Sequence, residues 1–216
     1  MNRENRRAVI LIAVGTFIVL VLTILYTISL TYRPAYSASI GPQKYVALRT
    51  LPNGTHTATL HLNIVQEVGV GPHPDWLGYQ VHGAQVPGTI FHLPTNTLVT
   101  VIVDNFDSRT APRNNFFTLV QGTVGGVEYV NGKKLTVMNP DLVSHTFTIP
   151  DLGVSVPMEG IPDSGNPDHE TMKFSFWIRK AGNYRWQCII PCGSGLYGFG
   201  GPMQEFGYMD GWLNVS

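Results

Sequence analysis

The sequence predicts an all-β domain, a sandwich or Greek-key barrel, preceded by one transmembrane helix. Three observations lead to this fold class. An apolar segment without charged residues lies near the N-terminus, several short β-type segments follow it, and turn residues are abundant, with 23 glycines and 15 prolines in 216 residues. Short strands between turn signals are typical of sandwiches and barrels, and no amphipathic helix is expected beyond the apolar segment.

The apolar segment covers residues 8–30 and is long enough to cross a hydrocarbon core of about 30 Å as a helix. Arg3, Arg6 and Arg7 precede it, so the charge bias places the N-terminus in the cytoplasm and the rest of the chain outside. We therefore predict a single-pass protein of the cell membrane. The alternative is a cleaved signal peptide, although the apolar region of such peptides usually spans only about 7–15 residues.

These features divide the chain into three parts. Residues 1–30 are predicted to be the cytoplasmic N-terminus and the membrane anchor. Residues 31–44 have the Pro, Ser and Gly content of a linker. Residues 45–216 are predicted to form the extracytoplasmic β domain.

Strands are predicted where apolar and polar residues alternate or where β-branched residues form a run. The dipeptide Asn131-Gly132 favours a tight turn and predicts a hairpin. The segment from 150 to about Thr171 is rich in Pro and Gly and is expected to be a loop, and 106–141 is a long excursion without an assigned role. The predicted strands cover residues 58–65, 97–103, 127–130, 134–137, 143–149, 172–179, 184–187 and 210–215.

Charge and motifs exclude several function classes. The formal net charge is zero and only 13% of residues are charged, which argues against nucleic acid as a partner. The sequence contains neither a Gly-rich phosphate loop nor a His-Glu-x-x-His run. Acid–base and nucleophilic catalysis therefore find little support in the sequence.

The two cysteines of the chain, Cys188 and Cys192, are four residues apart and follow an aromatic-rich strand. The exterior of a cell is oxidising, so a disulfide or a metal site is expected there. Together with His145 and Met209 they form a soft ligand set of the kind that copper selects. The cysteines therefore favour a copper site.

Three segments of the chain resemble the copper-binding domain of cytochrome c oxidase subunit II and its cupredoxin relatives. The first contains a histidine before a strand, the second contains the Cys-x3-Cys-Gly loop, and the third contains a methionine before the last strand. They are Pro140-Asp-Leu-Val-Ser-His145-Thr-Phe-Thr-Ile-Pro150-Asp-Leu-Gly153, Gly182-Asn-Tyr-Arg-Trp-Gln-Cys188-Ile-Ile-Pro-Cys192-Gly193 and Met209-Asp-Gly211-Trp-Leu-Asn-Val215.

The resemblance implies a cupredoxin-like Greek-key fold with one or two copper ions. His145, Cys188, Cys192 and Met209 match the side-chain ligands of the family, and the backbone carbonyl would come from Ile190. The implied function is electron transfer from an external donor to a membrane oxidase. Other subunits of that complex would be the partners.

The chain departs from the family pattern in the loop between the second cysteine and the methionine. The second histidine of the family pattern is missing. Leu196 stands at its position when residues are counted forward from Cys192, and Phe206 stands there when they are counted back from Met209. The loop is about ten residues longer than usual, and Met203 within it is an alternative to Met209. An altered copper site, a Cys188–Cys192 disulfide without metal, or a site completed by another histidine are all compatible with the pattern. The candidates for that histidine are His82, His92 and His169.

Three functions follow from these alternatives. The first is a copper electron-transfer subunit of a haem-copper oxidase type. The second is a copper-free structural subunit of a quinol-type oxidase or another membrane complex, with the cysteines paired. The third is copper capture or delivery at the cell surface. The other histidines, His56, His61 and His73, are expected to be surface or core residues.

Overall fold

The protein is described from a computed structural model in which residues 3–31, 46–84 and 89–216 are placed. The chain divides into two compact units, Met1–Ala35 and Tyr36–Ser216. The predicted linker at 31–44 lies, apart from Thr31, outside the described residues and stays a prediction.

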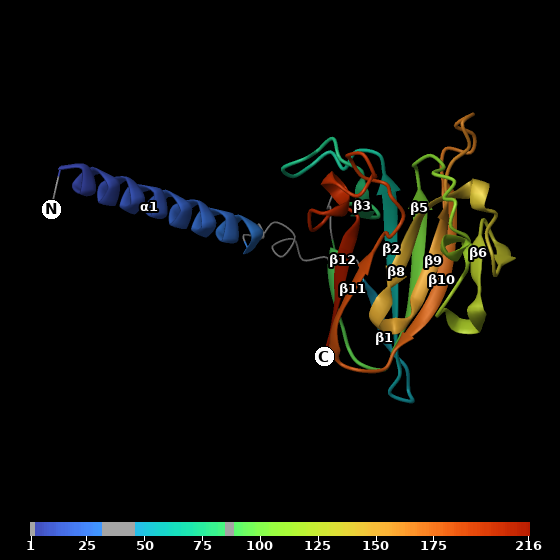
Figure 1. Cartoon of the computed structure of the whole chain (residues 1–216). Helices are drawn as coiled ribbons and strands as arrows, with labels where there is room; N and C mark the ends of the chain where they lie inside the picture. The colour runs from blue at the N-terminus through green and yellow to red at the C-terminus, as the bar shows by residue number, and fades with distance from the viewer. Residues whose placement is uncertain (1–2, 32–45, 85–88) are drawn as a thin grey trace. The chain divides into compact units, whose positions relative to one another are not determined.

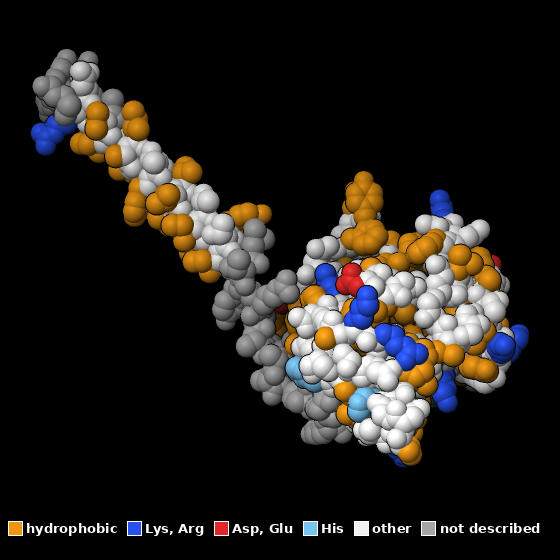
Figure 2. All heavy atoms as spheres, turned by 90° about the horizontal axis from the view of Figure 1, so that it is seen from below, with side chains coloured by type: hydrophobic (Ala, Val, Ile, Leu, Met, Phe, Trp, Pro, Cys, Tyr) orange, Lys and Arg blue, Asp and Glu red, His pale blue; other side chains and the backbone are white. Residues whose placement is uncertain are grey.

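The first unit contains the helix α1 (Arg3–Thr31). Its segment Asn5–Ile28 has a mean hydropathy of 3.0 and is not buried within the protein. Figure 2 shows hydrophobic side chains along the length of this helix. The predicted long apolar helix is confirmed, and its composition suits either a membrane anchor or a signal sequence.

The second unit consists of two sheets packed as a sandwich (Figure 1). The larger sheet has the order β1-β2-β5-β10-β6-β7, with β3 also paired to β2. Its strands are β1 (Ala47–Thr50), β2 (His56–Val65), β3 (Gly78–Val81), β5 (Thr97–Asn105), β6 (Glu128–Val130), β7 (Lys133–Leu135) and β10 (Glu170–Ile178). The smaller sheet, in spatial order, contains β4 (Thr89–Leu93), β12 (Asp210–Val215), β11 (Gly182–Gln187), β8 (Val143–Ile149) and β9 (Val154–Glu159).

The core lies between the two sheets. Alternate residues of β2, such as Leu60 and Leu62, are fully buried, as the apolar alternation predicts. Phe147 and Trp186 from the smaller sheet stack with ring centroids 5.1 Å apart, and Tyr79 packs edge-on against Trp186 at 5.0 Å. This aromatic cluster packs between the two sheets.

The predicted strands agree closely with the structure. Every one of them is present, with ends shifted by no more than two residues, and the all-β fold class is confirmed. Asn131 and Gly132 have φ values of 49° and 80°, which are the positive angles that the predicted two-residue hairpin turn requires. The strands β1, β3 and β4, of four or five residues each, were not predicted.

The prediction of a loop from 150 to about Thr171 was wrong for Val154–Glu159, which forms β9. Val156 and Met158 are buried, and β9 pairs with β8 in an antiparallel arrangement. Pro157 is tolerated because β9 is the edge strand of its sheet. The Pro and Gly residues of this segment concealed the alternation of its apolar residues.

Candidate metal centre

Three segments bring the predicted nitrogen and sulfur donors together. His145 lies in β8, Cys188 directly follows β11, and Cys192 lies in the loop that leads to β12. The backbone N–H of Ile189 donates to the hydroxyl of Thr146 at 3.0 Å, so the start of the loop is fixed to β8. The donors therefore come from segments whose positions are set by the sandwich.

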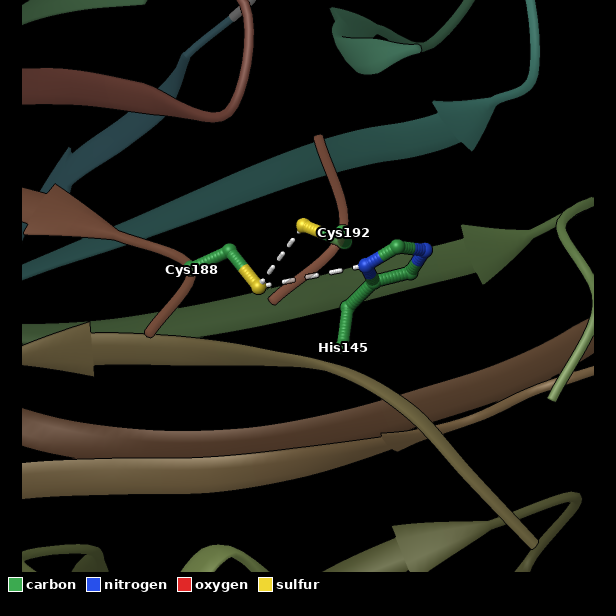
Figure 3. A group of neighbouring side chains, drawn as sticks. All are labelled: His145, Cys188 and Cys192. Atoms are coloured by element: carbon green, nitrogen blue, oxygen red, sulfur yellow. Dashed lines mark hydrogen bonds between the residues drawn. The ribbon is translucent and has the colours of Figure 1, made fainter. Parts of the chain in front are cut away.

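The side chains of His145, Cys188 and Cys192 lie next to one another (Figure 3). Nδ1 of His145 lies 3.8 Å from Sγ of Cys188, which lies 3.4 Å from Sγ of Cys192. The carbonyl oxygen of Ile190 lies 3.6 Å from Sγ of Cys188. His145 and Cys188 are buried, while Cys192 is partly buried. The group can hold a metal ion.

The two cysteines are free thiols in this structure. Their sulfur atoms are 3.4 Å apart, whereas a disulfide bond is about 2.05 Å long. The structure thus presents two separate sulfur donors beside one imidazole.

The two candidate methionines occupy different positions. Sδ of Met203 lies 3.0 Å from Sγ of Cys192. Met209 is buried in the hydrophobic core, and its carbonyl accepts a hydrogen bond of 2.9 Å from the N–H of Cys188. The contact with the second thiol belongs to Met203, the methionine that the sequence prediction ranked second.

The long loop after Cys192 explains how Met203 reaches the centre. The loop folds back on itself, with hydrogen bonds in both directions between Ser194 and Gly200. A Cβ atom on Gly193 would lie 2.1 Å from the Gly200 carbonyl oxygen and 2.9 Å from Cγ of Met203. A glycine is therefore required there, and the extra residues of the loop place a third sulfur beside the thiols.

Asp107 is a further residue of the centre, and the sequence prediction missed it. One of its carboxylate oxygens lies 2.8 Å from Nε2 of His145, on the side of the ring opposite Cys188. Metal-binding histidines commonly donate their second ring N–H to a carboxylate, which fixes the tautomer and the ring orientation. Only the folded structure reveals this contact, because 38 residues separate the two side chains.

Burial and mutual contacts shift the pKa values of the centre. Burial alone would lower the pKa of His145, but its hydrogen bonds to Asp107 and Cys188 raise it to about 9. Burial would raise the pKa of the Cys188 thiol, but hydrogen bonds from Cys192 and His145 lower it well below its usual value. The hydrogen bond with Cys188, together with burial, raises the pKa of Cys192. Without metal, these contacts favour the charged forms of His145 and Cys188 and the neutral thiol of Cys192.

No second histidine joins the group among the residues that the structure describes. His82 stacks on another histidine, His92 is exposed in β4, and His169 is hydrogen-bonded to Asp168. A cavity of about 330 Å³ instead adjoins Cys188. Its lining residues are Arg185, Gln187, Cys188, Ile189, Phe199, Met203 and Gln204.

Comparison with known proteins gives distant structural similarities only. No family model and no curated protein matches the chain. Solved structures that are similar include reduced rusticyanin, with 13% identity, a TM-score of 0.38 and coverage of 80% of this chain and 91% of that one. Rusticyanin from Thiobacillus ferrooxidans has 15% identity, a TM-score of 0.37 and coverage of 80% and 88%. A multicopper oxidase has 12% identity, a TM-score of 0.34 and coverage of 74% and 44%. Similarities at this level carry no argument about function.

Proposed function

We propose that this protein is a copper electron-transfer protein that its N-terminal helix holds at a membrane. The observation that carries the proposal is a buried imidazole facing two free thiols, with a methionine sulfur 3.0 Å from the second thiol. Thiolate, thioether and imidazole donors together suit copper, whereas magnesium and calcium prefer oxygen donors. The donor set therefore fits the metal.

Each residue has a distinct part in this proposal. Nδ1 of His145, the sulfur atoms of Cys188 and Cys192 and Sδ of Met203 would hold the metal, with the Ile190 carbonyl nearby. Copper supplies a couple that accepts and returns one electron. The protein supplies a fixed set of donors, because two of these side chains are buried and the loop is hydrogen-bonded to β8.

Asp107 is assigned a positioning role. Its contact with Nε2 of His145 leaves Nδ1 directed at Cys188. A ring that is held in this way does not turn when the charge of the metal changes. Little rearrangement then accompanies electron transfer.

The wider function in the proposal is delivery of electrons from an external donor to a membrane oxidase complex. An apolar helix of sufficient length and the three segments that resemble oxidase subunit II support this part. The β domain would lie outside the cell and the N-terminus in the cytoplasm, following the positions of Arg3, Arg6 and Arg7.

Metal analysis of the full-length chain in detergent tests the proposal. We expect bound copper with intense thiolate-to-copper absorption in the visible range, and we expect both to be lost in Cys188→Ser. Met138→Leu is the matched control, because Met138 is a buried methionine that is not among the residues contacting the thiols. This control should keep the copper and the absorption.

Two other results would contradict the proposal, and each would support an alternative. A colourless chain without free thiols would indicate a structural subunit with a Cys188–Cys192 disulfide. Tight Cu(I) binding without a stable coloured Cu(II) form would indicate copper capture or delivery.

A further inference from the structure

We propose that His61, His82 and Asp104 form a second metal site, on the outer face of the larger sheet. The bound ion would be a divalent cation of intermediate softness, such as Zn²⁺. The donor atoms of the three residues lie within 4.8 Å of one another. The site shares no residue with the cysteine centre.

The sheet itself brings the three residues together. His61 lies in β2 on the face opposite the buried Leu60 and Leu62. Asp104 lies near the end of β5, which runs parallel to β2 as its direct neighbour. His82 directly follows β3, and its N–H donates to the carbonyl of His61 at 2.9 Å. Three strands therefore fix the backbone positions of the ligands.

The side chains already share one carboxylate oxygen. Oδ2 of Asp104 lies 2.7 Å from Nε2 of His61 and 3.4 Å from Nδ1 of His82. The two imidazole rings stack with centroids 3.8 Å apart. Among the ion pairs of the described residues, Asp104 pairs with these two histidines and with no Lys or Arg. The carboxylate is thus free of a competing cation.

Neighbouring polar groups orient the ligands. The hydroxyl of Thr171 donates to Oδ1 of Asp104 at 2.7 Å, which turns Oδ2 towards the histidines. The contact of Thr171 with Asp104 is of the kind that commonly holds the ligands of metal sites in place. Nδ1 of His82 also lies 3.0 Å from Oδ1 of Asn63, and an ion bound by this nitrogen would replace that contact.

The exposure of the group suits an ion that enters from solvent. The side chain of Asp104 is 11% exposed, while those of His61 and His82 are 34% and 50% exposed. One wall of the site is therefore fixed within the protein and the other faces water. Water can complete the coordination on the open side.

Metal binding requires the side chains of this group to rearrange. Donors at about 2.0–2.2 Å from a tetrahedral Zn²⁺ lie about 3.3–3.5 Å apart, and the contact between His82 and Asp104 already has this length. The contact between His61 and Asp104 must lengthen when the ion replaces the shared proton. The stacked rings must also tilt, because a metal lies in the plane of each imidazole, and the half-exposed His82 has room to do so.

The chemistry separates this site from the cysteine centre. Two imidazoles and a carboxylate suit Zn²⁺ and related divalent ions, whereas Cu(I) prefers sulfur. The second site therefore requires no copper, and it stands whether or not the cysteine centre transfers electrons.

Calorimetric titration of the full-length chain in detergent with Zn²⁺ tests the proposal. We expect His82→Ala and His61→Ala to bind one Zn²⁺ fewer than the wild type, or to bind it at least about tenfold more weakly. His169→Ala is the matched control, because His169 also lies 2.9 Å from an aspartate but belongs to no such group. It should bind as the wild type does.

A second measurement observes the two stacked imidazole rings in the wild type, so it does not require a variant to fold. Nuclear magnetic resonance should show the ring signals of His61 and His82 shifting together as Zn²⁺ is added to the wild type. Equal Zn²⁺ uptake by the wild type and both variants, or unchanged signals of these two rings, would overturn the proposal.

Discussion

Two histidine–aspartate pairs in this protein have similar geometry and opposite surroundings. Nε2 of His145 lies 2.8 Å from Asp107 within the sandwich, and Nε2 of His61 lies 2.7 Å from Asp104 on its outer face. In the first pair, the other ring nitrogen faces thiols, so the aspartate orients the ligand. In the second pair, the aspartate lies between two histidines and is itself a proposed ligand. The neighbours of such a pair, rather than the pair, decide its metal chemistry.

Burial adds to this difference. The side chain of His145 is 1% exposed, whereas that of His82 is 50% exposed. The inner cluster offers sulfur from mostly buried side chains, while the outer group faces water and offers nitrogen and oxygen. We therefore expect the first to select copper and the second to select zinc.

The largest expected effect is a steep rise of Cu(I) affinity with pH at the buried cluster. The pKa of His145 is raised to about 9, and that of Cys192 is also raised, so both groups carry a proton at neutral pH. Copper must displace both protons, so its affinity should rise by about 100-fold per pH unit below about pH 9.

Competition with a Cu(I) chelator, between about pH 6 and about pH 8, measures this dependence. An affinity that does not change with pH would contradict the protonation state that the contacts imply.

The next effect compares the same substitution in the two pairs. Asp104→Asn removes a proposed ligand and should lower Zn²⁺ affinity at the outer group by about 100-fold, while Asp107→Asn removes only an orienting contact and should lower Cu(I) affinity by about tenfold. Calorimetry with Zn²⁺ and chelator competition with Cu(I) measure the two values. Equal losses at both sites would remove the distinction between ligand and positioning group.

The smallest effect concerns the methionines near the buried cluster. Met203→Leu should shift the visible absorption of the copper form and lower copper affinity by about tenfold, because Sδ of Met203 lies beside Cys192. Met209→Leu conserves volume in the core, so it should leave the absorption unchanged and cost less than about 1.5 kcal/mol of stability. Absorption spectra and thermal unfolding of the two variants test which methionine is the ligand. If Met209→Leu shifts the absorption and Met203→Leu does not, Met209 is the ligand.

Much of the fold could be predicted from the sequence, because the signals are local. Alternation along 58–65 set the buried face of β2, and Asn131-Gly132 set a turn that requires positive φ values. β9 was missed because Pro157 is an unfavourable strand residue unless the strand lies at a sheet edge. Edge position is a property of the assembled sheet and cannot be derived from a single segment.

The residues of the two proposed metal sites could likewise be predicted only where the sequence signal is local. His145, Cys188 and Cys192 could be chosen because their flanking segments carry a recognisable pattern. The contact of Met203 depends on how the glycine-rich loop folds back, and that of Asp107 depends on packing between distant segments. The outer group depends on the pairing of β2 with β5 and β3, so no local sequence pattern indicates it.

X-ray absorption at the copper edge of the copper-loaded chain tests the central claim most directly. We expect a first shell dominated by sulfur, with one imidazole nitrogen, and loss of the copper signal in Cys188→Ser. A first shell of nitrogen and oxygen alone would show that copper binds away from the cysteines, and the electron-transfer proposal would then be wrong.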